Sequence, residues 1–328
     1  MKRIILIVAL ICITISCSAF MVKRKKDPGY LYARKYGAKA NIELHVIDDD
    51  GKPVPDANVE VFMGMNLRNK GRWITGTTNT NGVFLVKGKT TGDEIEYYIK
   101  KDGYYRTFKK FTFAEMGKES NVVNGKWQPY GERETIVLRE KRNPINIPTE
   151  LLWNFKYTNQ INLWIGYDIE KNDFVEPTGT GKVADFEVYF DWNGDWLPNY
   201  KGMSVKIRFT EPYGGYYTSK SNNLSELRHP YYANPDLICL TSAYFFEKKL
   251  DNEAFEQKKF DTNKCWIVRS RCKISPEGKL LESNYSVLYN IVFTCTKEGT
   301  VGFCLTKTFN PTPNDTNLEP EKVPTHSF

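Results

Sequence analysis

The stretch that decides the fold is NIELHVIDDDGKPVPDANVEVF over residues 41–62, followed by TTNTNGVFLVKGKTTGDEIEYYIKKDGYY over residues 77–105. Apolar Ile42, Leu44 and Val46 alternate with other side chains, which is the period-two pattern of a strand with one buried face. Further strands are expected from Ala57 to Val61, from Val83 to Val86 and from Ile95 to Ile99. The stretch therefore predicts short strands joined by tight turns.

The turns between these strands have a clear chemistry. Asp48 to Gly51 closes the first strand, because Asp side chains bond the local backbone and Gly accepts a positive φ. Pro53 and Pro55 keep the next residues extended and out of any ladder. Asn79 to Gly82 and Lys101 to Tyr104 are two further turn sequences, so the chain is expected to reverse at each of them.

In this order, the residues resemble the carboxypeptidase-regulatory-like domain, a small transthyretin-like β-sandwich appended to many secreted bacterial proteins. That family has a D-x-x-G-x-P-x-x-x-A-x-V opening, a polar T-x-x-x-G turn before an aromatic residue, and a late G-Y. The matching positions are Asp48, Gly51, Pro53, Ala57, Val59, Thr78, Gly82, Phe84, Gly103 and Tyr104. The resemblance covers residues 40–140 and implies a fold and a secreted context, without a catalytic activity. Residues 111–130 depart from it as an insertion, expected as a surface loop or a binding loop, before a last strand from Thr135 to Leu138.

Residues 1–22 have the features of a targeting segment, because a basic pair precedes an apolar run from Ile4 to Ile15. Three outcomes stay open: acylation of Cys17 in a lipoprotein, cleavage after Ala19 in a soluble secreted protein, and an uncleaved membrane anchor. The basic run from Lys23 to Lys26 argues against export, because positive charges favour the cytoplasmic side of a membrane. The expected location is the cell envelope, with a lipid anchor, or the extracellular space.

The composition is that of a folded protein with a mild positive charge. Apolar residues make up 41% and aromatic residues 14% of the 328 residues, which is enough for the cores of two domains. The net charge of +7 falls to +5 without the two basic residues that begin the leader. A basic run beside an apolar segment indicates attraction to anionic lipid rather than to nucleic acid. We therefore expect the N-terminal segment to contact a membrane and expect no nucleic-acid partner.

The whole chain is expected to be mostly β, with two antiparallel β-sandwich-like domains after the N-terminal segment. The expected parts are a signal peptide or membrane anchor (1–22), a polar tether (23–39), the regulatory-like sandwich (40–140), a linker (141–149), a second β-sandwich-like domain (150–310) and a tail (311–328). Alternation such as Phe186, Val188 and Phe190 supports strands in the second half. Short helices are expected at 148–154 and 251–257. NDFVEP, SELRHPYYA and FNPTPNDTNLE resemble segments of secreted bacterial proteins, and this resemblance implies no activity.

Cysteine placement predicts a disulfide and no zinc site. Five cysteines lie in the second half, no pair has C-x-x-C spacing, and the chain has only three histidines. A two-residue turn centred on Gly299 and Thr300 would place Cys295 and Cys304 opposite each other on a hairpin, at a distance that a disulfide can bridge. The alternative is two buried thiols on one sheet face.

Sequence motifs predict no catalytic residue, metal site or cofactor. Gly179 to Lys182 is similar to part of a phosphate-binding loop, but Val183 replaces the Ser or Thr that holds Mg²⁺. Asp191 to Asp195 offers alternating oxygen atoms, but no Glu follows at the distance that an EF-hand needs. Histidine bases are scarce and no G-x-S-x-G elbow occurs. A hydrolase, or an accessory protein of one, is therefore the least favoured function.

Aromatic residues are the strongest functional lead. Exposed flat rings beside Asn and Asp suit stacking on sugar faces or on a partner protein, and loops often carry binding sites in a β-sandwich. The predicted binding residues are Trp192, Trp196, Tyr213, Tyr216 and Tyr217. The alternative is that these rings fill a wide β core. The sequence favours a noncatalytic binding or adhesion protein with an envelope glycan or protein as its partner, glycan binding being one form of this role. The alternative function is a structural or assembly component of the envelope.

Overall fold

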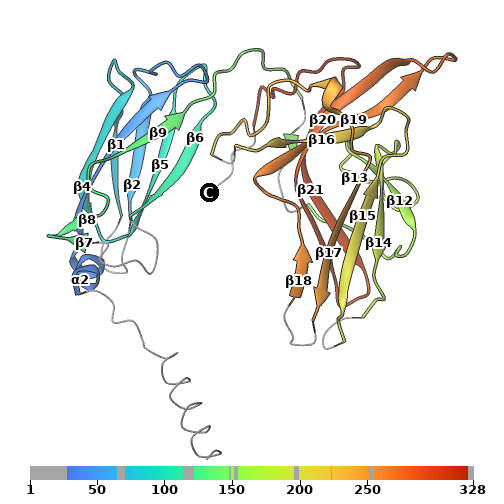
Figure 1. Ribbon diagram of the computed structural model, residues 1–328, viewed down its shortest axis with the longest axis horizontal. Helices are drawn as coiled ribbons and strands as arrows, with labels where there is room; N and C mark the ends of the chain where they lie inside the picture. Colours follow the sequence, from blue (N-terminus) through green and yellow to red (C-terminus); the bar gives the residue numbers. More distant parts are fainter. Residues whose placement is uncertain are drawn as a thin grey trace, which may run out of the picture. The chain divides into compact units, whose positions relative to one another are not determined.

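The computed structural model describes residues 28–64, 71–113, 122–147, 149–150, 154–195, 199–222, 224–250 and 255–323. The protein is mostly β, which confirms the predicted fold class (Figure 1). It divides into two compact units, one of residues up to 99 with 108–137, and one of residues 100–107 with those from 138 onwards. The predicted targeting segment and Cys17 lie outside the described residues. Within the described ranges, no helix is both long and apolar enough to cross a membrane.

The first unit consists of two sheets (Figure 1). One has the order β3 (Arg72–Thr77), β2 (Asn58–Met63), β5 (Glu94–Lys100) and β6 (Thr107–Thr112). The other has the order β4 (Val83–Thr90), β1 (Ala38–Ile47), β8 (Lys126–Trp127) and β7 (Val122–Val123), with β9 (Glu132–Val137) pairing β1 in parallel. Ile42, Leu44 and Val46 on β1 are fully buried, as their alternation predicts.

The predicted turns form, and their side chains stabilise them. Oδ1 of Asp48 accepts hydrogen bonds from the backbone N–H groups of Asp50 and Lys52. Oδ1 of Asn79 likewise accepts from two backbone N–H groups in its own turn. Gly82 has a φ of +71°, and a Cβ atom there would lie 2.4 Å from a backbone oxygen, so only glycine fits.

Two segments of the first unit are more ordered than the sequence predicts. The expected polar tether contains α2 (Pro28–Tyr36), whose Arg34 forms an ion pair with Asp93 at 3.0 Å. In the insertion at 111–130, β8 provides Trp127, which is fully buried and donates a hydrogen bond from Nε1 to the carbonyl oxygen of Thr90. The described residues of this insertion are therefore not simply a surface loop, because the indole of Trp127 belongs to the core. Strand β3 also lies between the two stretches quoted above, where the sequence predicts no strand.

The second unit is a sandwich of two six-stranded sheets. The first has the order β13 (Asp173–Phe174), β12 (Trp164–Asp168), β14 (Phe186–Asp191), β15 (Gly202–Arg208), β17 (Ser242–Lys249) and β18 (Phe255–Lys258). The second has the order β10 (Thr149–Glu150), β21 (Val301–Asn310), β20 (Leu280–Cys295), β19 (Lys264–Ile274) and β16 (Gly215–Lys220), with β11 (Lys156–Thr158) also pairing β21. Phe303 on β21 contacts Tyr167 and Phe186 from the other sheet, so the inner faces form one core. A single 3₁₀ turn, η1 (Pro235–Leu237), is also described.

Residues 141–147 and 311–323, expected as parts of a linker and a tail, pack into the second unit. The side chain of Glu319 is fully buried and accepts hydrogen bonds from the backbone N–H groups of Arg142 and Asn143, at 2.8 and 2.7 Å. The Tyr105 hydroxyl donates to the carbonyl oxygen of Pro320 at 2.8 Å. These contacts give both segments a fixed place, because a buried carboxylate must keep its hydrogen-bond donors.

The two predicted helices are wrong where the structure describes them. Residues 149–150 form β10, and Phe255–Lys258 form β18, which pairs with β17. Short apolar runs do not distinguish a helix from a strand, and pairing with a long neighbouring strand decides the outcome here.

The predicted disulfide is also wrong, because the hairpin has a different register. Cys295 lies opposite Val301, and Cys304 lies opposite Val292. Residues 297–299 form the turn, whereas the prediction assumed a two-residue turn further along the chain. Cys304 therefore lies three residues beyond Val301, the residue opposite Cys295. Because this offset is odd, the two cysteine side chains point to opposite faces of the sheet. Cys295 is a buried free thiol.

Candidate functional site

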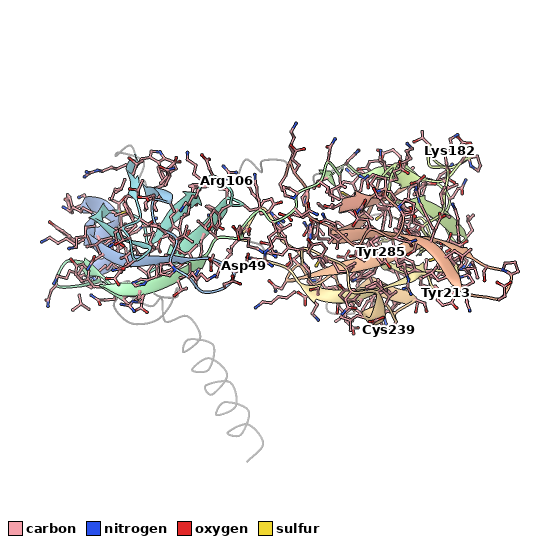
Figure 2. All side chains as sticks on the ribbon, turned by 90° about the horizontal axis from the view of Figure 1, so that it is seen from above. Asp49, Arg106, Lys182, Tyr213, Cys239 and Tyr285 are labelled. Carbon is pink, nitrogen blue, oxygen red and sulfur yellow. The ribbon has the colours of Figure 1, made fainter. Side chains whose placement is uncertain are left out.

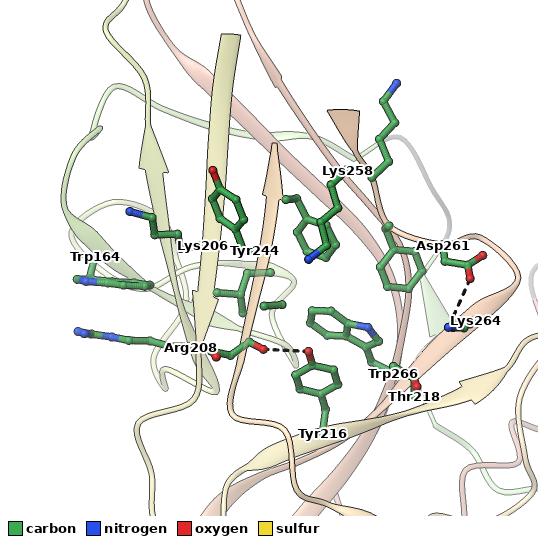
Figure 3. A pocket seen from close by; sticks show the side chains of 16 residues that line it. Trp164, Lys206, Arg208, Tyr216, Thr218, Tyr244, Lys258, Asp261, Lys264 and Trp266 are labelled. Atoms are coloured by element: carbon green, nitrogen blue, oxygen red, sulfur yellow. Dashed lines mark hydrogen bonds and ion pairs between the residues drawn. The ribbon is translucent and has the colours of Figure 1, made fainter. Parts of the chain in front are cut away.

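A groove opens at one side of the second unit, where the edges of its two sheets separate (Figure 3). β18 pairs with β17 only along residues 246–249, so residues 242–245 of β17 form an open sheet edge. In the opposite sheet β16 is the outermost strand. The space between has a volume of about 790 Å³, and we call it the lateral groove. This size is within the range of pockets that bind small ligands.

Aromatic rings form the floor of the lateral groove. Trp266 stacks on Tyr216 with 4.0 Å between ring centroids, and its ring also lies 5.9 Å from that of Phe245 and 5.7 Å from that of Phe260. All four side chains are buried. The Tyr216 hydroxyl donates a hydrogen bond to the carbonyl oxygen of Ser242 at 3.1 Å (Figure 3). The floor is therefore rigid, because a stack from β16 and β19 is tied to β17.

The rim of the lateral groove is basic and partly aromatic. The guanidinium of Arg208 lies 4.0 Å from the ring centroid of Trp164 and pairs with Glu187, and Lys264 pairs with Asp261 at 3.7 Å. The Tyr244 ring is 43% exposed. The basic lining residues are Lys206, Arg208, Lys258, Lys259 and Lys264, against one acidic residue, Asp261. This combination can attract a negatively charged ligand and can provide ring faces for stacking.

Most of the predicted binding residues lie elsewhere. Trp192 is 2% exposed, and its Nε1 donates to the carbonyl oxygen of Asp195, so it is a core residue and its prediction as an exposed binding ring is wrong. Tyr216 and Tyr217 are also buried, on the two opposite faces of β16, which begins at Gly215. Tyr213 is exposed on a loop outside the groove (Figure 2). Trp196 lies outside the described residues.

The sequence prediction missed the residues that form the lateral groove, apart from Tyr216. Trp266 has no predicted role, and Lys258 and Lys259 directly follow the predicted helix at 251–257. One signal was present: Tyr244 and Phe246 are aromatic residues two apart, a spacing that places both on one face of β17. Their ring centroids are indeed 5.7 Å apart.

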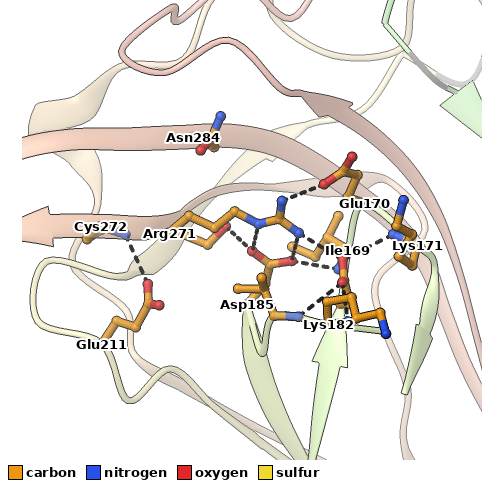
Figure 4. A network of polar contacts seen from close by, with 12 residues as sticks. Ile169, Glu170, Lys171, Lys182, Asp185, Glu211, Arg271, Cys272 and Asn284 are labelled. Carbon is orange, nitrogen blue, oxygen red and sulfur yellow. Dashed lines mark hydrogen bonds and ion pairs between the residues drawn. The ribbon is translucent and has the colours of Figure 1, made fainter. Parts of the chain in front are cut away.

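A second polar site surrounds Arg271, inside the sandwich (Figure 4). Its guanidinium donates to Asp168 at 2.8 Å, to Asp185 at 3.0 Å and to Glu170. Burial acts to raise the pKa of Asp168, but backbone N–H donors and Arg271 outweigh it and lower that pKa. No group of three metal-ligating side chains placed to hold an ion occurs within the described ranges. We interpret the Arg271 cluster as a link between the sheets.

The two motifs considered for phosphate and calcium form ordinary turns. In the loop before β14, Asp173 accepts hydrogen bonds from the backbone N–H and the hydroxyl of Thr180. Lys182 forms an ion pair with Glu176 at 2.6 Å. After β14, the side chain of Asn193 accepts from the backbone N–H of Asp195. These polar groups bond each other locally.

Comparison with known proteins identifies no family. No family model matches the chain, and no curated protein matches it. Among solved structures, catechol 1,2-dioxygenase of Acinetobacter radioresistens is 16% identical, with a TM-score of 0.25, over 36% of this chain and 56% of that one. Chlorocatechol 1,2-dioxygenase of Pseudomonas putida is 12% identical, with a TM-score of 0.25, over 32% of this chain and 61% of that one. The match thus spans less than two thirds of either enzyme, and similarity this weak carries no functional argument.

Proposed function

We propose that this protein is a noncatalytic binding protein of the cell envelope or the extracellular space, and that the lateral groove binds a glycan. The observation that carries the proposal is the combination of a rigid aromatic floor with the exposed ring of Tyr244 and polar groups at the rim. Sugar rings offer apolar faces that stack on aromatic side chains and hydroxyl groups that bond polar neighbours. The lining includes no histidine or cysteine, and its only carboxylate is that of Asp261.

Replacing Tyr244 with alanine is expected to weaken glycan binding about tenfold, because the exposed ring loses its stacking contact. Binding of the full-length protein to a panel of polysaccharides would be measured by isothermal titration calorimetry. Tyr213→Ala is the matched control, since Tyr213 is an equally exposed tyrosine outside the groove. Weaker binding by the Tyr213 variant alone would move the site to that loop and contradict the proposal.

The second candidate function is an assembly component that captures an extended segment of a partner protein. One observation favours it: residues 242–245 of β17 form an open edge beside the groove. An added strand would bind through main-chain hydrogen bonds. Co-purification of one stoichiometric protein partner, retained by the Tyr244→Ala variant, would favour this function over glycan binding.

The envelope or extracellular location rests on residues 1–22 and is tested by the intact mass of the protein from fractionated cells. We expect a mature chain that begins at an acylated Cys17 or is cut after Ala19. An uncleaved chain with its main part in the cytoplasm would contradict the location. It would agree with the basic run from Lys23 to Lys26, which argues against export.

A further inference from the structure

The lateral groove concentrates positive charge. Five of its lining residues are basic and one is acidic, whereas the whole chain has 46 basic and 39 acidic residues. The single acid, Asp261, already pairs with Lys264. Like charges held around one concave site repel one another, and a bound anion relieves that repulsion.

Lys258 and Lys259 are the cations most available to a ligand. Both are exposed. Lys258 is the last residue of β18, and Lys259 follows it. Among the described residues, neither forms an ion pair, in contrast to Lys206, Arg208 and Lys264, which have the partners Asp191, Glu187 and Asp261. Exposed lysines without a counter-ion lose little when they bind an anion, because no existing pair has to be broken.

Further positive charge lies on the outward face of the same sheet, next to Lys258. Lys206 and Arg208 are two residues apart on β15, so both point to the same face, and that face also holds Trp164 and Tyr244 (Figure 3). Lys258, which lies opposite Phe246, is on this face as well, so a ligand at the open edge of β17 meets several cations and the exposed ring of Tyr244 along one surface. An elongated molecule with repeated negative charges and apolar ring faces fits this arrangement.

We infer that the lateral groove binds an acidic glycan, a polysaccharide whose sugar rings carry carboxylates, and that Lys258 and Lys259 contact those carboxylates. The inference rests on the proposed function and specifies its ligand class. Lysine suits this role, because its ammonium group is a flexible point charge that tolerates several carboxylate positions. An acidic peptide could also offer carboxylates to the lysines. It would offer no sugar rings to stack on the exposed aromatic side chains of the rim.

The test compares two glycans with the same backbone, polygalacturonate and its methyl ester, with alginate as a second carboxylate-bearing polymer. We expect full-length protein to bind the two acidic polymers at least about tenfold more tightly than the ester at low salt, with the advantage falling as salt rises. The double variant Lys258→Gln, Lys259→Gln is expected to lose about tenfold in affinity for the acidic polymers and none for the ester.

The control is the double variant Lys279→Gln, Lys297→Gln, which removes the same charge from exposed turns outside the groove. Its affinity is expected to match the unaltered protein. Equal binding of polygalacturonate and its ester, insensitive to Lys258 and Lys259, would overturn the inference and leave the proposed glycan function standing. If no glycan binds and a poly-glutamate peptide does, with the same need for the lysines, both the inference and the glycan function are overturned.

Discussion

Replacing Arg271 with methionine is expected to lower the free energy of unfolding of the second unit by about 4 kcal/mol at neutral pH. Methionine keeps much of the side-chain volume and removes the charge. The carboxylates of Asp168 and Asp185 would then stay buried without the cation that compensates them (Figure 4). Breaking a buried ion pair from one side is costly for this reason, even where the intact pair adds little net stability.

The position of Arg271 explains why the whole unit should respond. It lies on β19, whereas Asp168 ends β12 in the facing sheet and Asp185 directly precedes β14. Asp185 also accepts hydrogen bonds from the Ser270 hydroxyl and the Ile169 backbone N–H, both at 2.7 Å. The cluster thus joins the two sheets through one guanidinium. Burial still raises the pKa of Asp185, so the loss in the variant should shrink in acid, where that carboxyl takes up a proton.

Chemical denaturation followed by tryptophan fluorescence would measure the loss. Lys273→Met is the matched control, because Lys273 lies on the same strand and forms an exposed ion pair with Glu282 at 2.6 Å. An exposed pair of this kind contributes less than about 1 kcal/mol. If both substitutions lower the free energy of unfolding equally, the Arg271 cluster is not what links the sheets.

The local features of this fold are predictable from sequence because they depend on near neighbours. Alternation at Ile42, Leu44 and Val46 indicates a buried strand face whatever packs against it. The turn ending at Gly82 likewise needs only Asn79 and a residue that accepts a positive φ. Both predictions therefore hold.

Features that depend on distant parts of the chain are not predictable in this way. Trp192 and Trp266 are both buried, yet only Trp266 lines the lateral groove, because β18 stops pairing at Lys258. The Arg271 cluster joins carboxylates from about a hundred residues earlier in the chain, and no spacing rule reaches that far. The hairpin turn contains three residues instead of the expected two. This difference is enough to place Cys295 and Cys304 on opposite faces of the sheet.

Acidification is expected to destabilise the second unit through His229. Its side chain is 2% exposed, and Nδ1 lies 2.9 Å from the carbonyl oxygen of Pro230, to which it donates a hydrogen bond. Burial lowers the pKa of His229 from 6.5 to about 4, because the protonated ring would lie away from water. The hydrogen bond to Pro230 opposes this shift, and the nearby charge of Arg139 adds to it.

The direction of the effect follows from proton binding in the two states. Between pH 6.5 and about pH 4 the unfolded chain protonates this histidine and the folded chain does not, so the free energy of unfolding falls as the pH falls. Above pH 6.5, the ordinary pKa of histidine, the ring is neutral in both states and this loss of stability does not occur. This difference between the pKa of His229 in the unfolded and folded states lowers the free energy of unfolding by about 2.5 kcal/mol between about pH 7 and about pH 4.5.

Chemical denaturation across this pH range would compare the unaltered protein with His229→Asn, whose amide N–H can still donate to the Pro230 carbonyl oxygen. We expect the variant to lose about 2.5 kcal/mol less on acidification, because asparagine does not titrate. An NMR titration of the His229 ring separates this cause from the carboxyl groups that protonate in the same range. Its resonances should remain those of a neutral ring down to about pH 5, because the folded-state pKa lies lower. A ring that titrates near 6.5 in the folded protein, or equal acid sensitivity in the two proteins, would show that burial of His229 does not control the stability of this unit.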